Sequence, residues 1–148
     1  MDIPIIIKYK NINIDNINIY EFDIQYNNNN FYIQCPIFTD YEIINSNNNK
    51  YLEIKLKYNK ISHNQFLSFI EAIEFKMKKI NKNITSQIIT DIQNNKVIKI
   101  KFNDNTNIYN KDKIQVDNLT SSKISLLLNI QFYKLYYTIN AIQILQLS

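Results

Sequence analysis

The stretch over residues 51–80 constrains the fold most, because it reads as a strand that runs directly into a helix. Within residues 51–58 apolar and polar side chains alternate, and this period of two places one set on a buried face. Ser62 and Gln65 have the spacing of a capping box, in which each residue satisfies the other's backbone N–H. An apolar stripe at helical spacing follows them. We therefore expect one main helix over residues 62–80, placed between strands.

Short alternating segments on both sides of this helix predict a mainly β protein. The expected strands cover residues 3–10, 12–26, 31–38, 96–102, 113–116, 123–133 and 138–147. Residues 41–49 read as a loop that can hold a short extended piece, and residues 103–112 read as a polar loop. Residues 84–92 fit either a short helix or a strand. Strands interrupted by one helix are typical of a β-barrel or sandwich. The sequence favours a five-stranded barrel, with residues 1–148 as a single domain.

The chain contains no glycine, so other residues must take the positions that need a positive φ. Asparagine tolerates that conformation best among the remaining residues. The asparagine runs at residues 27–30 and 47–49 are therefore predicted to be turns.

Lysine supplies all 17 basic residues, and Ile and Asn dominate the composition, which indicates a very AT-rich genome such as that of a large DNA virus, a cytoplasmic plasmid or a low-GC protist. The charge is uneven: residues 1–49 hold two lysines against six acids, and residues 50–148 hold fifteen lysines against seven acids. A basic region of this kind favours a polyanionic partner. The alternative is that AT-rich codons alone raise the lysine content.

Cys35 is the single cysteine, which excludes an internal disulfide and any cysteine-based zinc site. The chain shows neither a secretory leader nor an apolar run of about 18 residues. We therefore expect a soluble cytoplasmic protein that needs no cofactor and contacts no membrane.

No catalytic or metal-binding constellation is recognisable in the sequence. His63 is the single histidine, and its place at the start of the expected helix suggests an exposed side chain rather than a general base. Glu71 and Glu74 share a helical face, but pairing of Glu74 with Lys78 explains them better. Without glycine, a glycine-rich phosphate loop is excluded. These features favour a protein that is not an enzyme.

Lysines interleaved with aromatic residues are the strongest functional signal. Single-stranded nucleic acid is held by a positive groove and by rings on which bases stack, at about 1–3 kcal/mol per base. The candidate binding residues are Tyr51, Lys55, Lys57, Lys99, Lys101, Tyr109, Lys111, Tyr133, Lys134 and Tyr137. Tyr136 lies within the same crowded hairpin as the last three of these residues. The alternative is that the tyrosines are half-buried strand residues with their hydroxyls at the surface.

The order of segments resembles that of single-stranded DNA-binding proteins of large DNA viruses, and the composition and size are similar to those of yeast cytoplasmic linear (killer) plasmid proteins. The segments that carry the resemblance are residues 31–38, 50–57, 66–73, 117–119, 122–132 and 141–146. The resemblance implies an oligonucleotide-binding (OB) barrel that coats replication intermediates. Members often carry an acidic C-terminal tail, which residues 146–148 do not match.

Two classes of function follow from these features. The first is a sequence-tolerant single-stranded DNA-binding protein that supports replication of a cytoplasmic virus or plasmid, with RNA as an alternative ligand and with replication proteins or a second copy of the chain as candidate partners. The second is a structural, assembly or polymerase-accessory protein that binds protein instead. A binder of duplex ends is a third interpretation.

Overall fold

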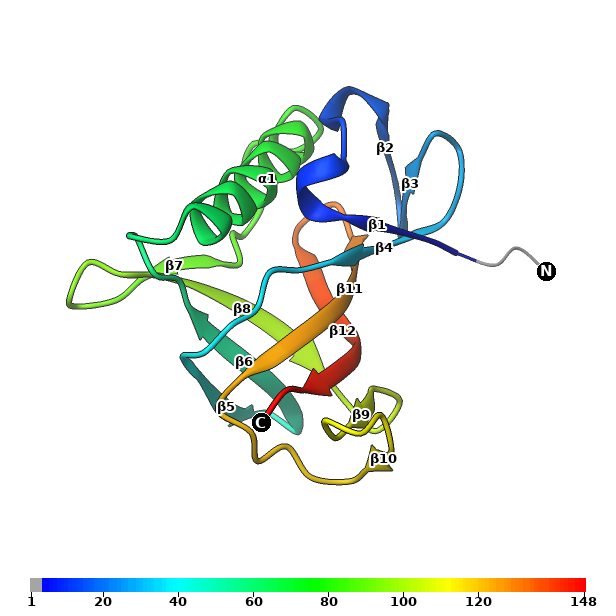
Figure 1. Ribbon diagram of the computed structural model, residues 1–148. Coiled ribbons are helices and arrows are strands. Elements are labelled where there is room, and N and C mark those ends of the chain that lie inside the picture. Colours follow the sequence, from blue (N-terminus) through cyan, green and yellow to red (C-terminus); the bar gives the residue numbers. More distant parts are fainter. Residues whose placement is uncertain (1–3) are drawn as a thin grey trace.

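The computed structural model describes residues 4–148, which form a mainly β fold with one α-helix (Figure 1). The elements are β1 (Ile5–Lys8), the 3-10 helices η1 (Tyr9–Asn11) and η2 (Ile14–Asn16), β2 (Ile17–Tyr20), β3 (Asp23–Tyr26), β4 (Phe31–Gln34), β5 (Tyr41–Ser46), β6 (Asn49–Lys55), α1 (Ile61–Lys78), β7 (Ile88–Thr90), β8 (Lys96–Phe102), β9 (Asn107–Tyr109), β10 (Gln115–Val116), β11 (Ile124–Phe132) and β12 (Tyr137–Gln146).

Ten strands form one mixed sheet, whose main path runs β1–β4–β11–β12–β8–β6–β5. β7 extends this sheet by pairing with β8, and β9 pairs with both β10 and the last part of β12. The remaining strands, β2 and β3, form a separate hairpin. The expected hairpin at the end of the chain is present as the antiparallel pair β11–β12.

The prediction of a five-stranded closed barrel is wrong, because the sheet has 10 strands and its path is open among the described residues. Two features explain the difference. β1 adds a parallel strand outside β4, and the chain leaves β4 at Pro36, which has no backbone N–H to continue a ladder. The following residues bond to β11 only at isolated points, such as the pair Phe38 and Ile124, before β5 joins the far end of the path.

The core follows the period-two and helical patterns of the sequence. Alternate residues of β11 are buried from Ile124 to Phe132, as expected, and so are Ile98, Ile100 and Phe102 of β8. Helix α1 lies at one end of the sheet beside η1 (Figure 1). The helix buries five members of the expected apolar stripe, namely Phe66, Phe69, Ile70, Ile73 and Met77. The sixth, Ile80, lies beyond the end of the helix and is exposed, so its place in the stripe is wrong.

Helix α1 begins and ends within two residues of the expected bounds, but its start differs from the prediction. The N-cap is Lys60, no side chain caps the helix, and Ser62 is already inside it. The expected capping box is therefore wrong. A turn in which Lys60 N donates to Lys57 O at 3.0 Å brings the chain into the helix one residue early.

His63 is buried, with 1% of its surface exposed, and the expectation of an exposed histidine is wrong. Its Nδ1 accepts from Lys57 N at 2.9 Å, and its Nε2 lies 3.0 Å from Ile37 O. These partners require a neutral ring in which Nε2 carries the proton. His63 thereby joins three segments: the exit from β6, the start of α1 and the link between β4 and β5.

The free energy of unfolding is expected to fall as the pH is lowered from 7 to 5.5. Burial lowers the pKa of His63 below 6.5, so the unfolded chain binds more protons than the folded chain in this range. One such group gives a slope of at most about 1.4 kcal/mol per pH unit. Urea unfolding of the wild type and the His63→Gln variant measures the effect. If the free energy of unfolding changed equally with pH in the two proteins, the prediction would be contradicted.

The prediction that asparagine replaces glycine in turns is confirmed. Of the eight described residues with positive φ, five are Asn27, Asn28, Asn47, Asn48 and Asn94. Two consecutive residues with positive φ are typical of tight two-residue hairpin turns. The other three are Phe22, Lys113 and Lys134.

Several strand bounds differ from the predictions. Residues 12–26 are a 3-10 helix followed by the hairpin β2–β3 rather than one bent strand. Residues 41–49, expected as a loop that can hold a short extended piece, contain the six-residue strand β5. Its pairing with β6 is a tertiary contact that the local pattern does not reveal. The first expected strand begins at Ile3, which lies outside the described residues.

Candidate nucleic-acid interface

Outward-facing residues of β6 and β8 bring one tyrosine and two lysines together. The antiparallel register places Tyr51 opposite Lys101 and Glu53 opposite Lys99. Their neighbours along these strands, Leu52 and Ile100, are completely buried, so alternation turns the other set toward solvent. The alternating pattern of each strand predicts which side chains face solvent. The pairing of β6 with β8 then brings those side chains together.

Lys99 lies over the face of the Tyr51 ring, with Nζ 4.2 Å from the ring centroid. A contact of this kind contributes about 0.5–1 kcal/mol at an exposed site. It holds the aromatic ring and the positive charge at one place on the sheet surface. A nucleotide needs this combination, because its base stacks and its phosphate needs a cation.

The turn between β11 and β12 supplies a second aromatic group. Tyr133 N donates to Tyr136 O at 2.8 Å, and Lys134 takes a positive φ of 69° to close the turn. This folds the rings of Tyr133 and Tyr136 onto each other, with centroids 4.9 Å apart and planes at 21°. Tyr136 is 47% exposed, so part of this aromatic pair is accessible to a ligand.

These two groups face one cleft of about 320 Å³, which we call the Lys–Tyr cleft. It is lined by Asn49, Tyr51, Gln87, Lys99, Lys101, Tyr133, Tyr136, Thr138 and Ile139. The lining contains two lysines, three tyrosines and no acidic residue. Its volume is at the lower end of the roughly 300–1,000 Å³ typical of small-molecule pockets. The cleft therefore suits a flat, negatively charged ligand, such as a strand that enters it one nucleotide at a time.

Four predicted lysines lie outside this lining, and three of them lie close to an acid. Lys57 Nζ is 3.1 Å from Asp40, Lys134 Nζ is 3.4 Å from Glu21, and Lys55 Nζ is 3.9 Å from Asp91. Exposed pairs of this kind contribute about 0–1 kcal/mol. These lysines can exchange an acid for a phosphate at low cost, but they add less net charge to the face than the sequence suggested.

Tyr137 cannot stack on a base, because its side chain is completely buried. Its hydroxyl donates to Glu74 Oε1 at 2.7 Å and accepts from Gln87 N at 3.2 Å. Burial, followed by the bond to Glu74, raises the pKa of Tyr137. The structure places this predicted residue in the core rather than at the cleft, because β12 begins at this position and pairs Tyr137 with buried Phe132.

Tyr109 and Lys111 lie at the other end of β12. The register pairs Tyr109 with Leu145, eight residues beyond Tyr137. At about 3.3 Å per residue, this distance is roughly 26 Å along the strand. Lys111 lines a separate cleft that also contains Asp112 and Asp117. The structure therefore does not bring these two predicted residues to the Lys–Tyr cleft.

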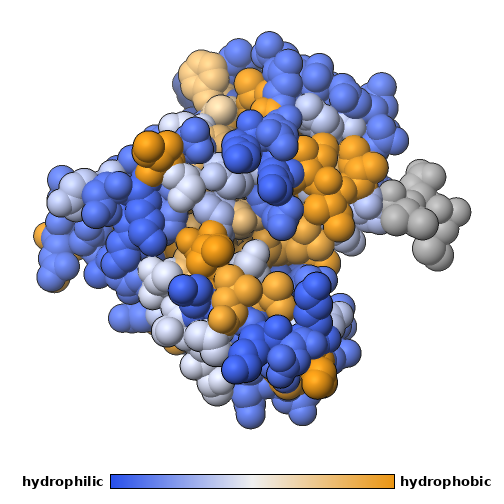
Figure 2. Space-filling model, viewed as in Figure 1, coloured by the Kyte–Doolittle hydropathy of each residue, from blue (hydrophilic) through white to orange (hydrophobic). Residues whose placement is uncertain are grey.

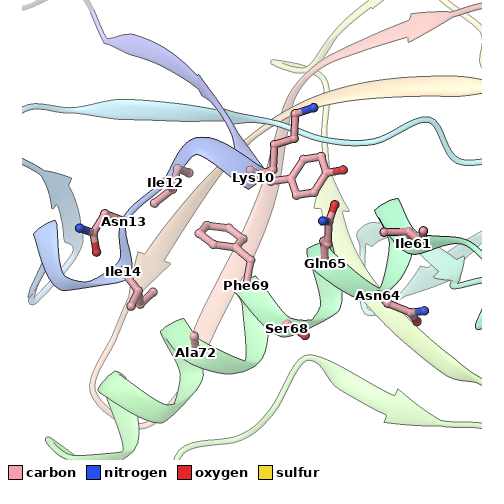
Figure 3. Close-up of a pocket in the computed structure, with 11 residues that line it drawn as sticks. Lys10, Ile12, Asn13, Ile14, Ile61, Asn64, Gln65, Ser68, Phe69 and Ala72 are labelled. Carbon is pink, nitrogen blue, oxygen red and sulfur yellow. The ribbon is translucent and has the colours of Figure 1, made fainter.

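A larger groove of about 640 Å³ separates α1 from the segment that contains η1 and η2 (Figure 3). Phe69 of α1 and Ile12 and Ile14 of that segment form its apolar part. Lys10 is its single lysine, and Figure 3 shows its side chain directed away from α1. This groove suits apolar groups better than a polyanion.

Four polar or aromatic residues that line the Lys–Tyr cleft are not among the binding residues predicted from the sequence: Asn49, Gln87, Tyr136 and Thr138. Tyr136 had a local signal, because it follows Tyr133 by three residues across an expected turn. Gln87 and Thr138 had none. Gln87 reaches the cleft because its Nε2 donates to Tyr137 O at 3.1 Å, a bond across 50 residues.

Within residues 4–148 no helix is both long and apolar enough to cross a membrane. The same part of the chain contains no group of three or more His, Cys, Asp and Glu side chains placed to hold a metal ion.

No protein-family model matches the chain, and no curated protein matches its sequence. Two solved structures are similar in fold. The single-stranded DNA-binding protein from bacteriophage Enc34 is 10% identical, with a TM-score of 0.49 over 76% of this chain and 79% of that chain. The same phage protein in complex with single-stranded DNA is 11% identical, with a TM-score of 0.46 over 76% and 80% of the two chains. The residues of the cleft itself must therefore indicate what this chain binds.

Proposed function

We propose that this chain binds single-stranded DNA, without sequence preference, through the Lys–Tyr cleft. One observation carries the proposal: Lys99 and Lys101 share a single cleft with Tyr51 and the stacked pair Tyr133–Tyr136, and no acid lines it. Lysine neutralises a phosphate without fixed geometry, and tyrosine stacks on any base. The chain has no arginine, which removes the best bidentate reader of base edges. Coating a strand needs no such reading.

Fluorescence anisotropy of labelled oligo-dT tests this function. The expected result is micromolar or tighter binding that weakens with salt, by about 0.7 decade per decade of salt for each phosphate neutralised. A duplex of the same length should bind more weakly, because paired bases offer no free faces for Tyr51 and Tyr136. Salt-insensitive binding, or no binding at micromolar protein, would contradict the proposal. Oligo-U in the same titration decides between DNA and RNA.

The finer proposal is that the chain coats replication intermediates of a virus or linear plasmid in the cytoplasm. The AT-rich composition and the segment resemblance support it. Binding to replication proteins and self-association on the strand belong to the same proposal. The proposal that the Lys–Tyr cleft binds single-stranded DNA does not depend on these finer points.

A second candidate function is protein binding in an assembly, and one observation favours it. β1 ends the path of the sheet, and its residues Ile5 and Ile6 are 40% and 60% exposed. Figure 2 shows a hydrophobic patch over β1, next to the N-terminal end. An exposed apolar edge strand is a surface on which another chain can pair. Light scattering with and without oligonucleotide distinguishes the two functions, because an assembly protein forms its oligomer without nucleic acid.

A further inference from the structure

Phe22 has a backbone conformation that a phenylalanine rarely adopts. It lies in the turn between β2 and β3 with a φ of 68°. The left-handed region is unfavourable for a bulky residue, and asparagine or glycine normally occupies it. The bond from Phe22 N to Phe132 O, at 2.6 Å, holds the turn in place. The side chain is nevertheless 59% exposed, so its burial does not offset the unfavourable backbone.

The Phe22 ring continues the aromatic group of the Lys–Tyr cleft. Its centroid lies 5.5 Å from that of Tyr133, with the planes at 67°. Tyr133 in turn stacks on Tyr136. The ion pair between Glu21 and Lys134 holds the tips of the two hairpins together beside these rings. Three rings therefore lead from the cleft across the β11–β12 turn onto the β2–β3 hairpin.

A second hollow, of about 200 Å³, lies beyond Phe22, and we call it the hairpin cleft. It is lined by Pro4, Phe22, Asp23, Ile24, Asn30, Phe31, Tyr32, Asn129, Ile130 and Gln131. Asn129 Oδ1 is buried there and has no hydrogen-bond partner among the described residues. A buried acceptor of this kind favours a ligand that brings an N–H donor.

The charge of the hairpin cleft favours a base over a phosphate. Asp23 lines it and no lysine does, so a phosphate would be repelled. A nucleobase is neutral and offers both a flat face for Phe22 and N–H groups for Asn129 Oδ1. The hollow thus has the chemistry of a base subsite next to a cleft that has the chemistry of a nucleotide site.

We propose that Phe22 is a base-stacking residue, and that the β2–β3 hairpin extends the path of a single strand from the Lys–Tyr cleft into the hairpin cleft. This inference rests on the proposed function. It assigns an order to the aromatic residues along the path: Tyr51, then Tyr136, Tyr133 and Phe22. It also explains why an exposed aromatic residue occupies a position that asparagine would fill with less strain.

The Phe22→Asn variant tests the proposal, because asparagine keeps the positive φ and removes the ring. Anisotropy is measured with an oligo-dT of about 4 nucleotides and one of about 12, which bracket much of the range of site sizes known for small binding domains. We expect the affinity for the longer strand to fall about 10-fold and that for the shorter strand to stay unchanged, because the variant loses one base–aromatic stack that only the longer strand reaches. Thermal unfolding should show equal or higher stability than the wild type.

Phe75→Asn is the matched control, because Phe75 is also an exposed phenylalanine, 64% accessible, but lies on α1. Its binding to both strands should equal that of the wild type. Equal affinity of Phe22→Asn and wild type for the longer strand would overturn the inference, and so would an equal loss on both strands. If the wild type binds neither strand, the proposed function fails, and this inference fails with it.

Discussion

Replacing Lys99 and Lys101 together by glutamine is expected to lower the affinity for oligo-dT about 25-fold at 0.1 M salt, as two phosphate contacts at 0.7 decade each imply. Both lysines line the Lys–Tyr cleft and neither forms an ion pair with an acid among the described residues. Their charge is therefore available to phosphates. Fluorescence anisotropy at fixed salt measures the loss.

The matched control is the double variant Lys111→Gln/Lys113→Gln, which changes the net charge by the same amount. Lys111 lies near the far end of β12, in a cleft that also contains Asp112 and Asp117. We expect this variant to bind oligo-dT within about twofold of the wild type, because both lysines lie in the turn between β9 and β10, and β9 pairs with the end of β12 far from the cleft. Exposed charges separated by more than a Debye length of about 10 Å are largely screened. A similar loss in both variants would mean that overall charge, rather than the cleft, attracts the strand.

The second large effect is on stability. The free energy of unfolding of the Tyr137→Phe variant is expected to be about 1–3 kcal/mol lower than that of the wild type, because the variant leaves a buried carboxylate and a half-buried N–H without a partner. Those groups are Glu74 Oε1 and Gln87 N, which the Tyr137 hydroxyl bonds at 2.7 and 3.2 Å. The hydroxyl thus links α1, β12 and the segment before β7. Urea unfolding at pH 7 measures the change.

Tyr136→Phe serves as the control for this prediction. Tyr136 is 47% exposed, so water can replace any bond its hydroxyl makes. Its free energy of unfolding should stay within about 0.5 kcal/mol of the wild type, as is usual for surface substitutions. If Tyr137→Phe were equally neutral, the network around Glu74 would contribute nothing to the fold.

The elements that the sequence predicted well are those in which burial alone sets the pattern. β8, β11 and the apolar stripe of α1 have one buried and one solvated face, so their side chains report the period directly. The turns at residues 27–30 and 47–49 were predictable because, without glycine, few residues tolerate a positive φ.

The elements that the sequence did not predict depend on distant partners. Phe22 takes a positive φ against its own preference, and Phe132 O, far along the chain, holds it there. His63 is buried because Lys57 N and Ile37 O both bond its ring. The open sheet depends on β1, whose pairing with β4 needs a parallel crossover that no local pattern specifies.

The residues of the candidate site likewise divide into those that the local sequence predicts and those that depend on distant partners. Tyr51, Lys99 and Lys101 were predictable, because alternation turns them outward and neighbouring strands bring them together. The choice between Tyr136 and Tyr137 was not, because a shift of one residue in the start of β12 exchanges the buried and exposed faces. Only the tertiary pairing of β9 with β12 shows that Tyr109 lies far from the cleft.

The salt dependence of oligo-dT binding tests the central claim most directly, because it counts the phosphates that particular lysines neutralise. The slope of log affinity against log salt should be about 1.4 shallower for Lys99→Gln/Lys101→Gln than for the wild type, and unchanged for Lys111→Gln/Lys113→Gln. Identical slopes in all three proteins would contradict a strand that lies in the Lys–Tyr cleft.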